Sequence, residues 1–567
     1  MKAIISFLSL SILVLFSRAQ VPNAFDYVSN KETISNKGAV VSAHALASEA
    51  GLAMLKKGGN AVDAAIATQF ALAVVLPVAG NIGGGGFMVA HLSNGKNIAL
   101  DFRETAPAAA SRDMYLDANG NPQLELSQNG RLSAGVPGSV AGMFAALKYA
   151  KLGMATLIAP AIQLAKYGFV ISEDQANSFN YMKESFIKYN NHKVAFVKES
   201  KWKAGDTLVQ KDLARTLERI RDLGKDGFYK GITASLIAKE MRWNNGIISL
   251  KDLDSYKVKE RVVTQFNYKG HQIISMPLPS SGGIILQQLF GMIEGRNIDS
   301  MGFQSPAATQ LMIEAERRAF ADRAFYQGDP DFVKVPVQQL VSNSYLQNRM
   351  SDFKYGVAGN SVITKEGMVD ESKETTHLSV LDNMGNAVSI TTTLNGSYGS
   401  KTVVNGAGFL LNNEMDDFSV KPGVPNMYGA VGNEKNAIAP GKRMLSSMTP
   451  TIVLKDEKPF IVVGTPGGTT IPTSVFQSIV NVIDFNMEAN AAVNYPKFHH
   501  QWLPDRVQLE KGFNNATRKT LQEYGYKVVE VDAIGRTEMI LIKYLPNGKR
   551  IITAVADRRG DDAVAAY

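Results

Sequence analysis

The sequence of 567 residues contains no cysteine. This absence excludes disulfide bonds, a thiolate nucleophile, and zinc or iron–sulfur sites built on cysteine. Any covalent catalysis must therefore use an oxygen or a nitrogen nucleophile. Histidine is also scarce, with seven residues in the chain, and the adjacent pair His499-His500 would point in different directions on a strand or a helix. We therefore expect neither a metal site nor a cofactor.

A strong excess of charge of one sign is lacking as well. Lys and Arg number 60 and Asp and Glu number 52, which gives a formal net charge of +8. No dense basic stripe interleaved with aromatic residues occurs, so a nucleic-acid partner is not expected. Hydrophobic residues make up 45% and charged residues 20% of the chain, a composition typical of globular proteins. At about 150 residues per domain, the length predicts three to four domain-sized units.

A hydrophobic run long enough to span a bilayer is also missing. Met1-Lys2 is a short basic start, residues 3–16 are apolar apart from serines, and Ser17-Arg18-Ala19 is a small-x-small site. This pattern predicts a secretory signal peptide at residues 1–19, with the mature chain beginning at Gln20. An uncleaved anchor is the alternative, but roughly 14 apolar residues fall short of the roughly 20 that span a bilayer. We expect a periplasmic or secreted protein without a stable membrane anchor.

Two glycine-containing motifs of known enzyme classes are incomplete in this chain. The segment Pro137-Gly138-Ser139-Val140-Ala141 lacks the flanking glycines of a nucleophile elbow. The segment Asn81-Ile82-Gly83-Gly84-Gly85-Gly86 is similar to a phosphate loop, but no Gly-Lys in the chain is followed by Ser or Thr. We interpret the glycine run as close backbone packing beside a strand.

Local signals predict the order of helices and strands. Two helices are expected to open the mature chain, at residues 48–57 and 61–75, because Gly58-Gly59 ends the first and Asn60 caps the second. The pair Asn94-Gly95 predicts a β-hairpin that delivers Arg103 at its exit. Helical periodicity dominates residues 138–250, and the C-terminal third is rich in strands. Further strands are expected at 377–381, 387–394, 451–454 and 460–463, and further helices at 159–167, 211–223, 284–293 and 471–485.

The pair Thr375-Thr376 stands at the start of one expected strand. Taken alone, such a pair reflects β-propensity. Distinctive motifs, however, occur before, around and after this pair, between residue 101 and residue 504. They are Asp101-Phe102-Arg103-Glu104-Thr105-Ala106-Pro107, Pro279-Ser280-Ser281-Gly282-Gly283, Glu374-Thr375-Thr376-His377, Leu411-Asn412-Asn413-Glu414-Met415-Asp416-Asp417-Phe418, Lys442-Arg443-Met444-Leu445-Ser446-Ser447-Met448, Gly464-Thr465-Pro466-Gly467-Gly468 and Phe498-His499-His500-Gln501-Trp502-Leu503-Pro504. With these motifs the chain after the signal resembles the γ-glutamyltransferase family.

The resemblance implies an α+β fold of the N-terminal-nucleophile hydrolase type, a four-layer αββα sandwich formed by two subunits cut from one precursor. The cut would fall between Glu374 and Thr375, giving a large subunit of residues 20–374 and a small subunit of residues 375–567. Thr375 would be the nucleophile, and its new α-amine the base that a threonine hydroxyl requires. The implied activity is that of a γ-glutamyltransferase and glutathione hydrolase, which transfers the γ-glutamyl group of glutathione and related compounds to water, amino acids or dipeptides.

The resemblance also implies roles for other residues, which suit a γ-glutamyl group with its α-carboxylate and α-ammonium. Thr393 would hydrogen-bond the nucleophile, although ordinary β-branched filler is the alternative interpretation of this residue. The backbone N–H groups of Gly467 and Gly468 would stabilise the oxyanion. The expected contacts are Arg103, Ser446 and Ser447 for the carboxylate, Asn395, Glu414 and Asp417 for the ammonium, and Tyr428, in a lid at residues 421–433, over the bound substrate.

Two rival functions remain open. A related enzyme could deacylate glutaryl-type β-lactam side chains, but a glutaryl group has no amine for Glu414 and Asp417. A secreted solute-binding protein that is never processed is the rival from another class. One band or two on a denaturing gel would distinguish such a protein from the processed enzyme.

Overall fold

Within residues 23–361 and 375–567, which the computed structural model describes, fourteen strands build two seven-stranded sheets with antiparallel pairing, and the other strands form a three-stranded and a two-stranded sheet. We call them sheet A and sheet B. The strands of sheet A are, in spatial order, β1 (Glu32–Ser35), β18 (Arg550–Val555), β17 (Glu538–Tyr544), β13 (Lys458–Gly464), β12 (Thr451–Lys455), β9 (His271–Ser275) and β8 (Thr264–Tyr268). Those of sheet B are β19 (Ala563–Ala566), β2 (Ala39–Ser42), β10 (Thr376–Leu381), β11 (Ala387–Thr393), β3 (Gly85–His91), β4 (Asn97–Asp101) and β7 (Lys259–Arg261).

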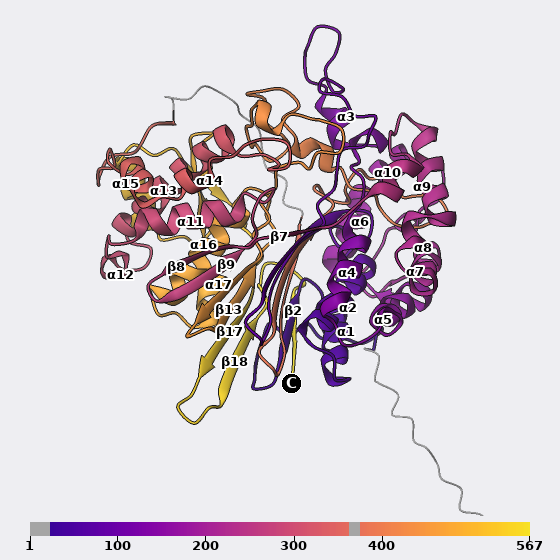
Figure 1. The fold of residues 1–567 in the computed structure, drawn as a ribbon, viewed down its shortest axis with the longest axis horizontal. Coiled ribbons are helices and arrows are strands. Elements are labelled where there is room, and N and C mark those ends of the chain that lie inside the picture. The colour runs from indigo at the N-terminus through magenta and orange to yellow at the C-terminus, as the bar shows by residue number, and fades with distance from the viewer. Residues whose placement is uncertain (1–22, 362–374) are drawn as a thin grey trace, which may run out of the picture.

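The two sheets pack face to face between two layers of helices (Figure 1). The helices on the side of sheet B are α1 (Ala45–Lys56), α2 (Ala61–Val75), α4 (Ser139–Ala146), α5 (Met154–Tyr167), α6 (Glu173–Tyr189), α7 (Lys211–Leu223), α8 (Asp226–Tyr229), α9 (Gly231–Trp243) and α10 (Leu250–Ser255), with α3 (Leu124–Gln128) above them. Those on the side of sheet A are α11 (Gly282–Ile293), α12 (Ile298–Met301), α13 (Pro306–Tyr326), α14 (Val337–Leu340), α15 (Asn343–Arg349), α16 (Thr470–Ile483), α17 (Ala489–Asn494) and α18 (Asn515–Glu523). The architecture is the expected four-layer αββα sandwich.

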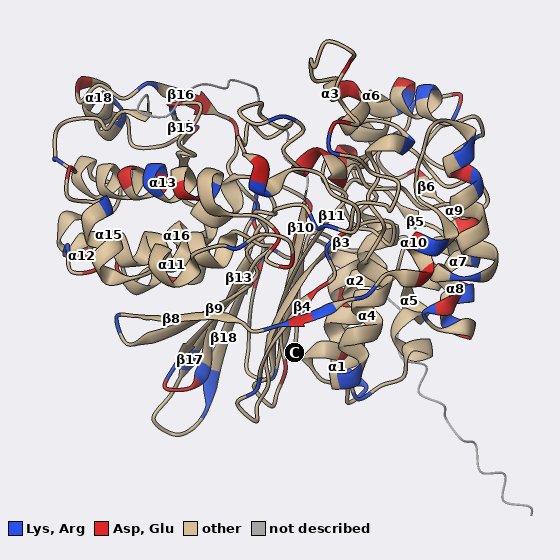
Figure 2. Ribbon diagram, turned by 45° about the horizontal axis from the view of Figure 1, so that its top comes forward, with Lys and Arg blue, Asp and Glu red and all other residues tan. Residues whose placement is uncertain are grey.

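Alternation along the strands explains why this sandwich forms. In β13, Val462 belongs to the apolar cluster between the sheets, whereas Ile461 and Val463 pack against the helices beside sheet A. In β3, Val89 lies between the sheets and Met88 faces the helices beside sheet B. Successive side chains of a strand point to opposite faces, so a strand covered on both sides must be apolar at both. Figure 2 shows that the central strands carry few charges and that both signs are interspersed on the outer helices.

Most elements expected from local signals are present. Asn60 caps α2 with a capping box that includes Asp63, and the hairpin of β3 and β4 ends two residues before Arg103. The expectation that two helices open the mature chain is wrong, because β1 and β2 precede α1. These four-residue strands pair with β18 and with β10 and β19, which come hundreds of residues later. No local signal in the sequence predicts pairing between strands that are so far apart in the chain.

The glycine run before β3 packs as expected against neighbouring backbone. A Cβ on Gly83 would lie 2.1 Å from the carbonyl oxygen of Leu410, and one on Gly84 would lie 2.1 Å from that of Thr393. Side chains do not fit at such distances, so only glycine allows β3 to approach β11 and the adjoining loop here.

The expected signal peptide and Glu374 lie outside the described residues. In the part of the chain that the structure describes, none of the helices has the length and apolar character that crossing a bilayer requires.

One edge of the two sheets gathers the ends of several strands. Strands β4, β11 and β13 end there, and β10 and β12 begin there. The segments that follow or precede them carry the motifs singled out in the sequence.

Candidate active site

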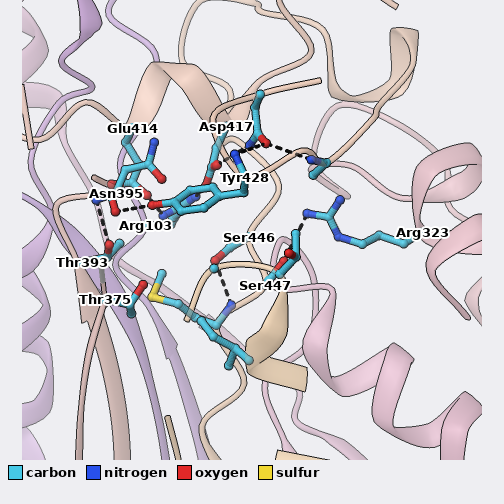
Figure 3. A pocket seen from close by; sticks show the side chains of 16 residues that line it. Arg103, Arg323, Thr375, Thr393, Asn395, Glu414, Asp417, Tyr428, Ser446 and Ser447 are labelled. Carbon is cyan, nitrogen blue, oxygen red and sulfur yellow. Dashed lines mark hydrogen bonds and ion pairs between the residues drawn. The ribbon is translucent and has the colours of Figure 1, made fainter. Parts of the chain in front are cut away.

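A small cavity lies at this edge (Figure 3). It is lined by Arg103, Arg323, Thr375, Thr393, Asn395, Glu414, Asp417, Asn426, Tyr428, Ala430, Ser446, Ser447, Met448, Gly468, Thr469 and Ile471. All expected site residues on the described chain are in this list except Gly467, which directly precedes Gly468. The structure thus brings together side chains from both halves of the sequence.

Thr375 and Thr393 stand side by side on neighbouring strands. The register of β10 and β11 pairs Thr376 with Thr392, so the next position along each strand places Thr375 opposite Thr393. Thr375 is 9% exposed and Thr393 is 2% exposed. The Thr393 hydroxyl accepts a hydrogen bond of 2.7 Å from the backbone N–H of Asn395, which fixes its orientation beside Thr375.

Gly467 and Gly468 form the turn between β13 and α16. Both have positive φ, at 137° and 56°, and the carbonyl oxygen of Gly467 accepts a 3.0 Å hydrogen bond from the N–H of Thr470 at the start of α16. Among the described residues, no group accepts a hydrogen bond from the N–H of either glycine. The two donors remain available, at a helix N-terminus where the dipole favours negative charge.

The charged groups expected at opposite ends of a substrate contact one another in this structure. The Arg103 guanidinium donates from Nη1 to Glu414 and from Nη2 to Asp417. It leaves 1% of its side chain exposed. The expected carboxylate ligand and the expected ammonium ligands therefore neutralise each other. A zwitterionic amino-acid head placed among them would offer a carboxylate to the cation and an ammonium to the anions.

A third carboxyl group, Glu104, lies behind this cluster, 3.7 Å from Arg103 Nη1. Burial raises the pKa of Glu104 to about 7, against the opposing charge of Arg103. Burial likewise raises the pKa of Glu414 well above its ordinary value and also raises the pKa of Asp417. The three carboxyl groups together therefore carry less than three negative charges near neutral pH.

The segment Ser446-Ser447 is held by the 279–283 loop. The N–H of Ser446 donates to the carbonyl oxygen of Pro279 at 2.9 Å, and the carbonyl oxygen of Ser446 accepts from both the N–H and the Oγ of Ser281 at 2.7 Å. These bonds fix the backbone of two serines whose hydroxyls face the cavity (Figure 3). The loop, one of the motifs named in the sequence analysis, thus positions a binding segment more than 160 residues away.

Tyr428 covers the cavity. Its hydroxyl donates to the carbonyl oxygen of Asn395, and its ring packs so closely on Gly468 that a Cβ there would lie 2.6 Å from Cδ1 of the ring. The neighbouring Asn426 donates from Nδ2 to Asp417 Oδ1 at 2.9 Å. The 421–433 segment is thus tied both to the expected oxyanion turn and to the expected ammonium ligands.

Six lining residues had not been expected, and two of them, Asn426 and Arg323, make side-chain hydrogen bonds to expected site residues. Asn426 lies in the 421–433 segment, but only Tyr428 was expected to make contact there. Arg323 is in the last turn of α13, and its partners Ser281 and Ser447 are 42 and 124 positions away. No local pattern marks such a residue, because an arginine near a helix C-terminus is ordinary. The motifs that carry the family resemblance do not include α13, so they did not indicate Arg323 either.

The histidines near the site are enclosed by neutral partners or structural ion pairs. His377 bonds through Nδ1 to Thr391 at 2.9 Å and through Nε2 to Ser379 at 3.1 Å, and burial lowers its pKa to about 3. His499 contacts Thr473, whereas His500 contacts Asp505. The adjacent pair therefore points to different neighbours, as its spacing predicted.

Comparisons with known proteins agree with this geometry. The profile of the family described as gamma-glutamyltranspeptidase matches residues 47–567. The glutathione hydrolase proenzyme of Escherichia coli strain K12 is 47% identical over 538 residues, which cover 94% of this chain and 92% of that protein. The crystal structure of cephalosporin acylase from Bacillus halodurans superimposes with a TM-score of 0.83 at 26% identity, covering 96% of this chain and 99% of that one. A chain of Helicobacter pylori gamma-glutamyltranspeptidase has a TM-score of 0.56 at 48% identity, covering 58% of this chain and 95% of that one.

Proposed function

The chain belongs to the gamma-glutamyltranspeptidase family, and from that premise we propose that it moves the γ-glutamyl group of glutathione and related compounds onto Thr375 Oγ, then to water, an amino acid or a dipeptide. One observation carries the proposal. Thr375 shares a single cavity with a cation, two serine hydroxyls and two carboxyl groups, the set that an α-amino acid head requires.

Self-cleavage makes the catalyst. Thr375 Oγ attacks the carbonyl carbon of Glu374, and the peptide C–N bond breaks to give an ester and the free α-amine of Thr375. Water then hydrolyses the ester and releases the carboxylate of Glu374 and the hydroxyl of Thr375. That amine then serves as general base with a reference pKa of about 7.7–8.0, near operating pH. The mature enzyme is a heterodimer of residues 20–374 and 375–567, made as a secreted or periplasmic precursor.

Acyl transfer runs in two steps on the same oxygen. The Thr375 amine takes the hydroxyl proton as Oγ attacks the γ-carbonyl of the donor, and the tetrahedral oxyanion accepts hydrogen bonds from the N–H groups of Gly467 and Gly468. Collapse expels the donor's amine with that proton and leaves a γ-glutamyl ester. Water or an acceptor amine attacks the ester, gives its proton to the Thr375 amine, and restores the free hydroxyl. Thr393 orients Thr375 throughout, and Tyr428 limits access of water.

Recognition of the γ-glutamyl head exchanges internal ion pairs for pairs with substrate. Arg103 and the hydroxyls of Ser446 and Ser447 take the α-carboxylate. The α-ammonium group is bound by Asn395, Glu414 and Asp417. Since the pocket is buried, each charge displaced from its internal partner must find its counterpart on the ligand.

The similarity to the cephalosporin acylase supports the acylase as the alternative function. The carboxyl groups of Glu414 and Asp417 in the cavity argue against it. A glutaryl group ends in a carboxylate alone. Its binding would engage Arg103 and leave Glu414 and Asp417 buried without a cation, which a selective site penalises strongly. An unprocessed binding protein has no use for two threonines side by side next to a pair of free N–H donors.

The test compares γ-glutamyl-p-nitroanilide with glutaryl-p-nitroanilide, which lacks only the amine. We expect the wild-type protein to use the first far better, and Asp417→Asn to narrow the gap by slowing the γ-glutamyl compound more. Asp416→Asn is the matched control, because Asp416 is the adjacent, fully buried carboxylate but binds Ser127 and the N–H of Met427 and does not line the cavity. It should affect both substrates alike. Equal wild-type rates on both substrates would favour the acylase.

A further inference from the structure

Arg323 differs in its partners from Arg103, the other arginine that lines the cavity, and from Arg318 on its own helix. Its side chain belongs to α13 and is buried, with the residue 8% exposed. Among the described residues, no carboxylate lies within 4.0 Å of its guanidinium, whereas Arg103 contacts Glu414 and Asp417, and Arg318 on the same helix contacts Glu314. Arg323 is thus a buried cation that lacks an anionic partner in the part of the chain that the structure describes.

Burying such a cation is unfavourable unless an anion arrives. Burial lowers the pKa of Arg323 to about 10, with Asp417 partly opposing this effect through its charge. The guanidinium lines the same cavity as Thr375, and Figure 3 shows it directed at Ser447 from the side opposite Arg103. A buried charge of this kind is stabilised by a ligand that brings the opposite charge.

The hydrogen bonds of Arg323 determine where neighbouring hydroxyl protons point. Nε donates to Ser281 Oγ at 3.1 Å and Nη2 donates to Ser447 Oγ at 3.3 Å. Ser281 Oγ donates its own hydrogen bond to the carbonyl oxygen of Ser446. Ser447 Oγ, in contrast, has no acceptor for its proton among the described residues. Because its oxygen is already an acceptor for Arg323, its hydroxyl is left to donate into the cavity.

The balance of positive and negative charges in the cavity also indicates that Arg323 is available to an anionic ligand. Arg103 is shared among Glu104, Glu414 and Asp417, so its charge is already balanced by anions before any substrate carboxylate arrives. A second cation is needed to offset that carboxylate, and Arg323 is the lining residue that supplies one.

We propose that Arg323 is a second cation of the α-carboxylate subsite, which positions the Ser447 hydroxyl to donate to the donor's carboxylate and balances its charge. The inference rests on the proposed function, since it takes the donor to be an α-amino acid linked through its side-chain carbonyl. Arg323 is a positioning residue rather than a catalytic one, because it acts through Ser447.

The experiment uses three p-nitroanilides on the processed enzyme: γ-glutamyl, glutaryl, which keeps the carboxylate, and 4-aminobutanoyl, which keeps only the amine. In Arg323→Gln, KM for the two carboxylate-bearing compounds should rise about 10–150-fold, the range for one charge-assisted hydrogen bond, while kcat changes much less. The 4-aminobutanoyl compound should stay within about twofold in kcat/KM. Where turnover is too slow to measure, inhibition constants of glutaramate, which keeps the carboxylate, and of 4-aminobutanamide, which keeps only the amine, give the same comparison.

Three further variants separate positioning from structure. Arg323→Lys keeps the charge and should recover part of the lost affinity. Ser447→Ala combined with Arg323→Gln should cost little more than the larger single loss, because both act on one contact. Arg318→Gln, a matched change in the same helix, should affect the three substrates equally.

Several outcomes would overturn the inference. An equal loss on all three compounds in Arg323→Gln would assign a structural role. Unchanged donor kinetics together with weaker use of glycylglycine, but not of glycinamide, would assign Arg323 to the acceptor's carboxylate. Wild-type enzyme that used 4-aminobutanoyl-p-nitroanilide as well as the γ-glutamyl compound would instead refute the proposed function, because no carboxylate subsite would then operate.

Discussion

Replacing Gly468 by alanine perturbs the contact between the lid and the expected oxyanion turn. Gly468 has a φ of 56°, where an alanine costs about 1–2 kcal/mol. The added Cβ would also lie 2.6 Å from Tyr428 Cδ1 and 3.0 Å from Cε1. Carbon atoms pack best at about 3.5–4.0 Å, so ring and turn must separate by about 1 Å.

That separation acts on catalysis in two ways. It pulls the Tyr428 hydroxyl from the carbonyl oxygen of Asn395 and shifts the N–H of Gly468 away from the developing oxyanion. A misplacement of about 1 Å near the chemistry can cost about 100-fold in rate. We therefore expect kcat/KM for γ-glutamyl-p-nitroanilide to fall about 100-fold, read from p-nitroaniline release.

Gly423→Ala is the matched control. Gly423 belongs to the same 421–433 segment and has a φ of 78°, but a Cβ there meets nothing within 4 Å. Both variants should lose about 1–2 kcal/mol of stability in denaturant unfolding, and only Gly468→Ala should lose the activity. If the two variants agree in kcat/KM within about threefold, the lid contact does not align the site.

The other expectations concern binding, the base and the second threonine. Arg103→Ala should lower kcat/KM for γ-glutamyl-p-nitroanilide by about 10–150-fold or more, and unchanged kinetics would remove it from the carboxylate site. Activity should rise through roughly pH 7–8 with the α-amine and not with His377, whose pKa burial lowers to about 3. A cleaved and folded His377→Gln protein without turnover would contradict this. Thr393→Val leaves the N–H of Asn395 without its acceptor and should lower kcat by about 5–150-fold. Thr393→Ser keeps the acceptor oxygen and should keep kcat close to the wild-type value. Equal kcat values for the two variants would show that Thr393 only fills space in its strand.

Local signals in the sequence were enough for elements whose partners are close in the chain. The Asp382–Asn386 turn predicts the β10–β11 hairpin, and that hairpin brings Thr375 and Thr393 together by register alone. The capping residues of α2 and the Asn94-Gly95 turn before β4 act over a few residues as well. In each case the cause of the structure lies within the segment itself.

Elements and contacts that depend on distant partners could not be foreseen in this way. Strand β1 is four residues long and pairs with β18, as Glu32 with Val555, so its stability comes from tertiary pairing rather than from its own composition. Arg323 meets Ser447 only because α13 and the loop before β12 are packed together. The direct pairing of Arg103 with Glu414 also depends on the folded arrangement, since complementary charges predict a common ligand but not their contact in its absence.

The central claim is that Thr375 is the nucleophile of both self-cleavage and acyl transfer, and the mass of the small subunit tests it most directly. Purified protein should contain a small chain of 193 residues (567 − 375 + 1) beginning at Thr375. Thr375→Ala should remain one uncut chain without transferase activity. A small chain that begins at another residue, or a Thr375→Ala protein that is still cleaved, would contradict the account.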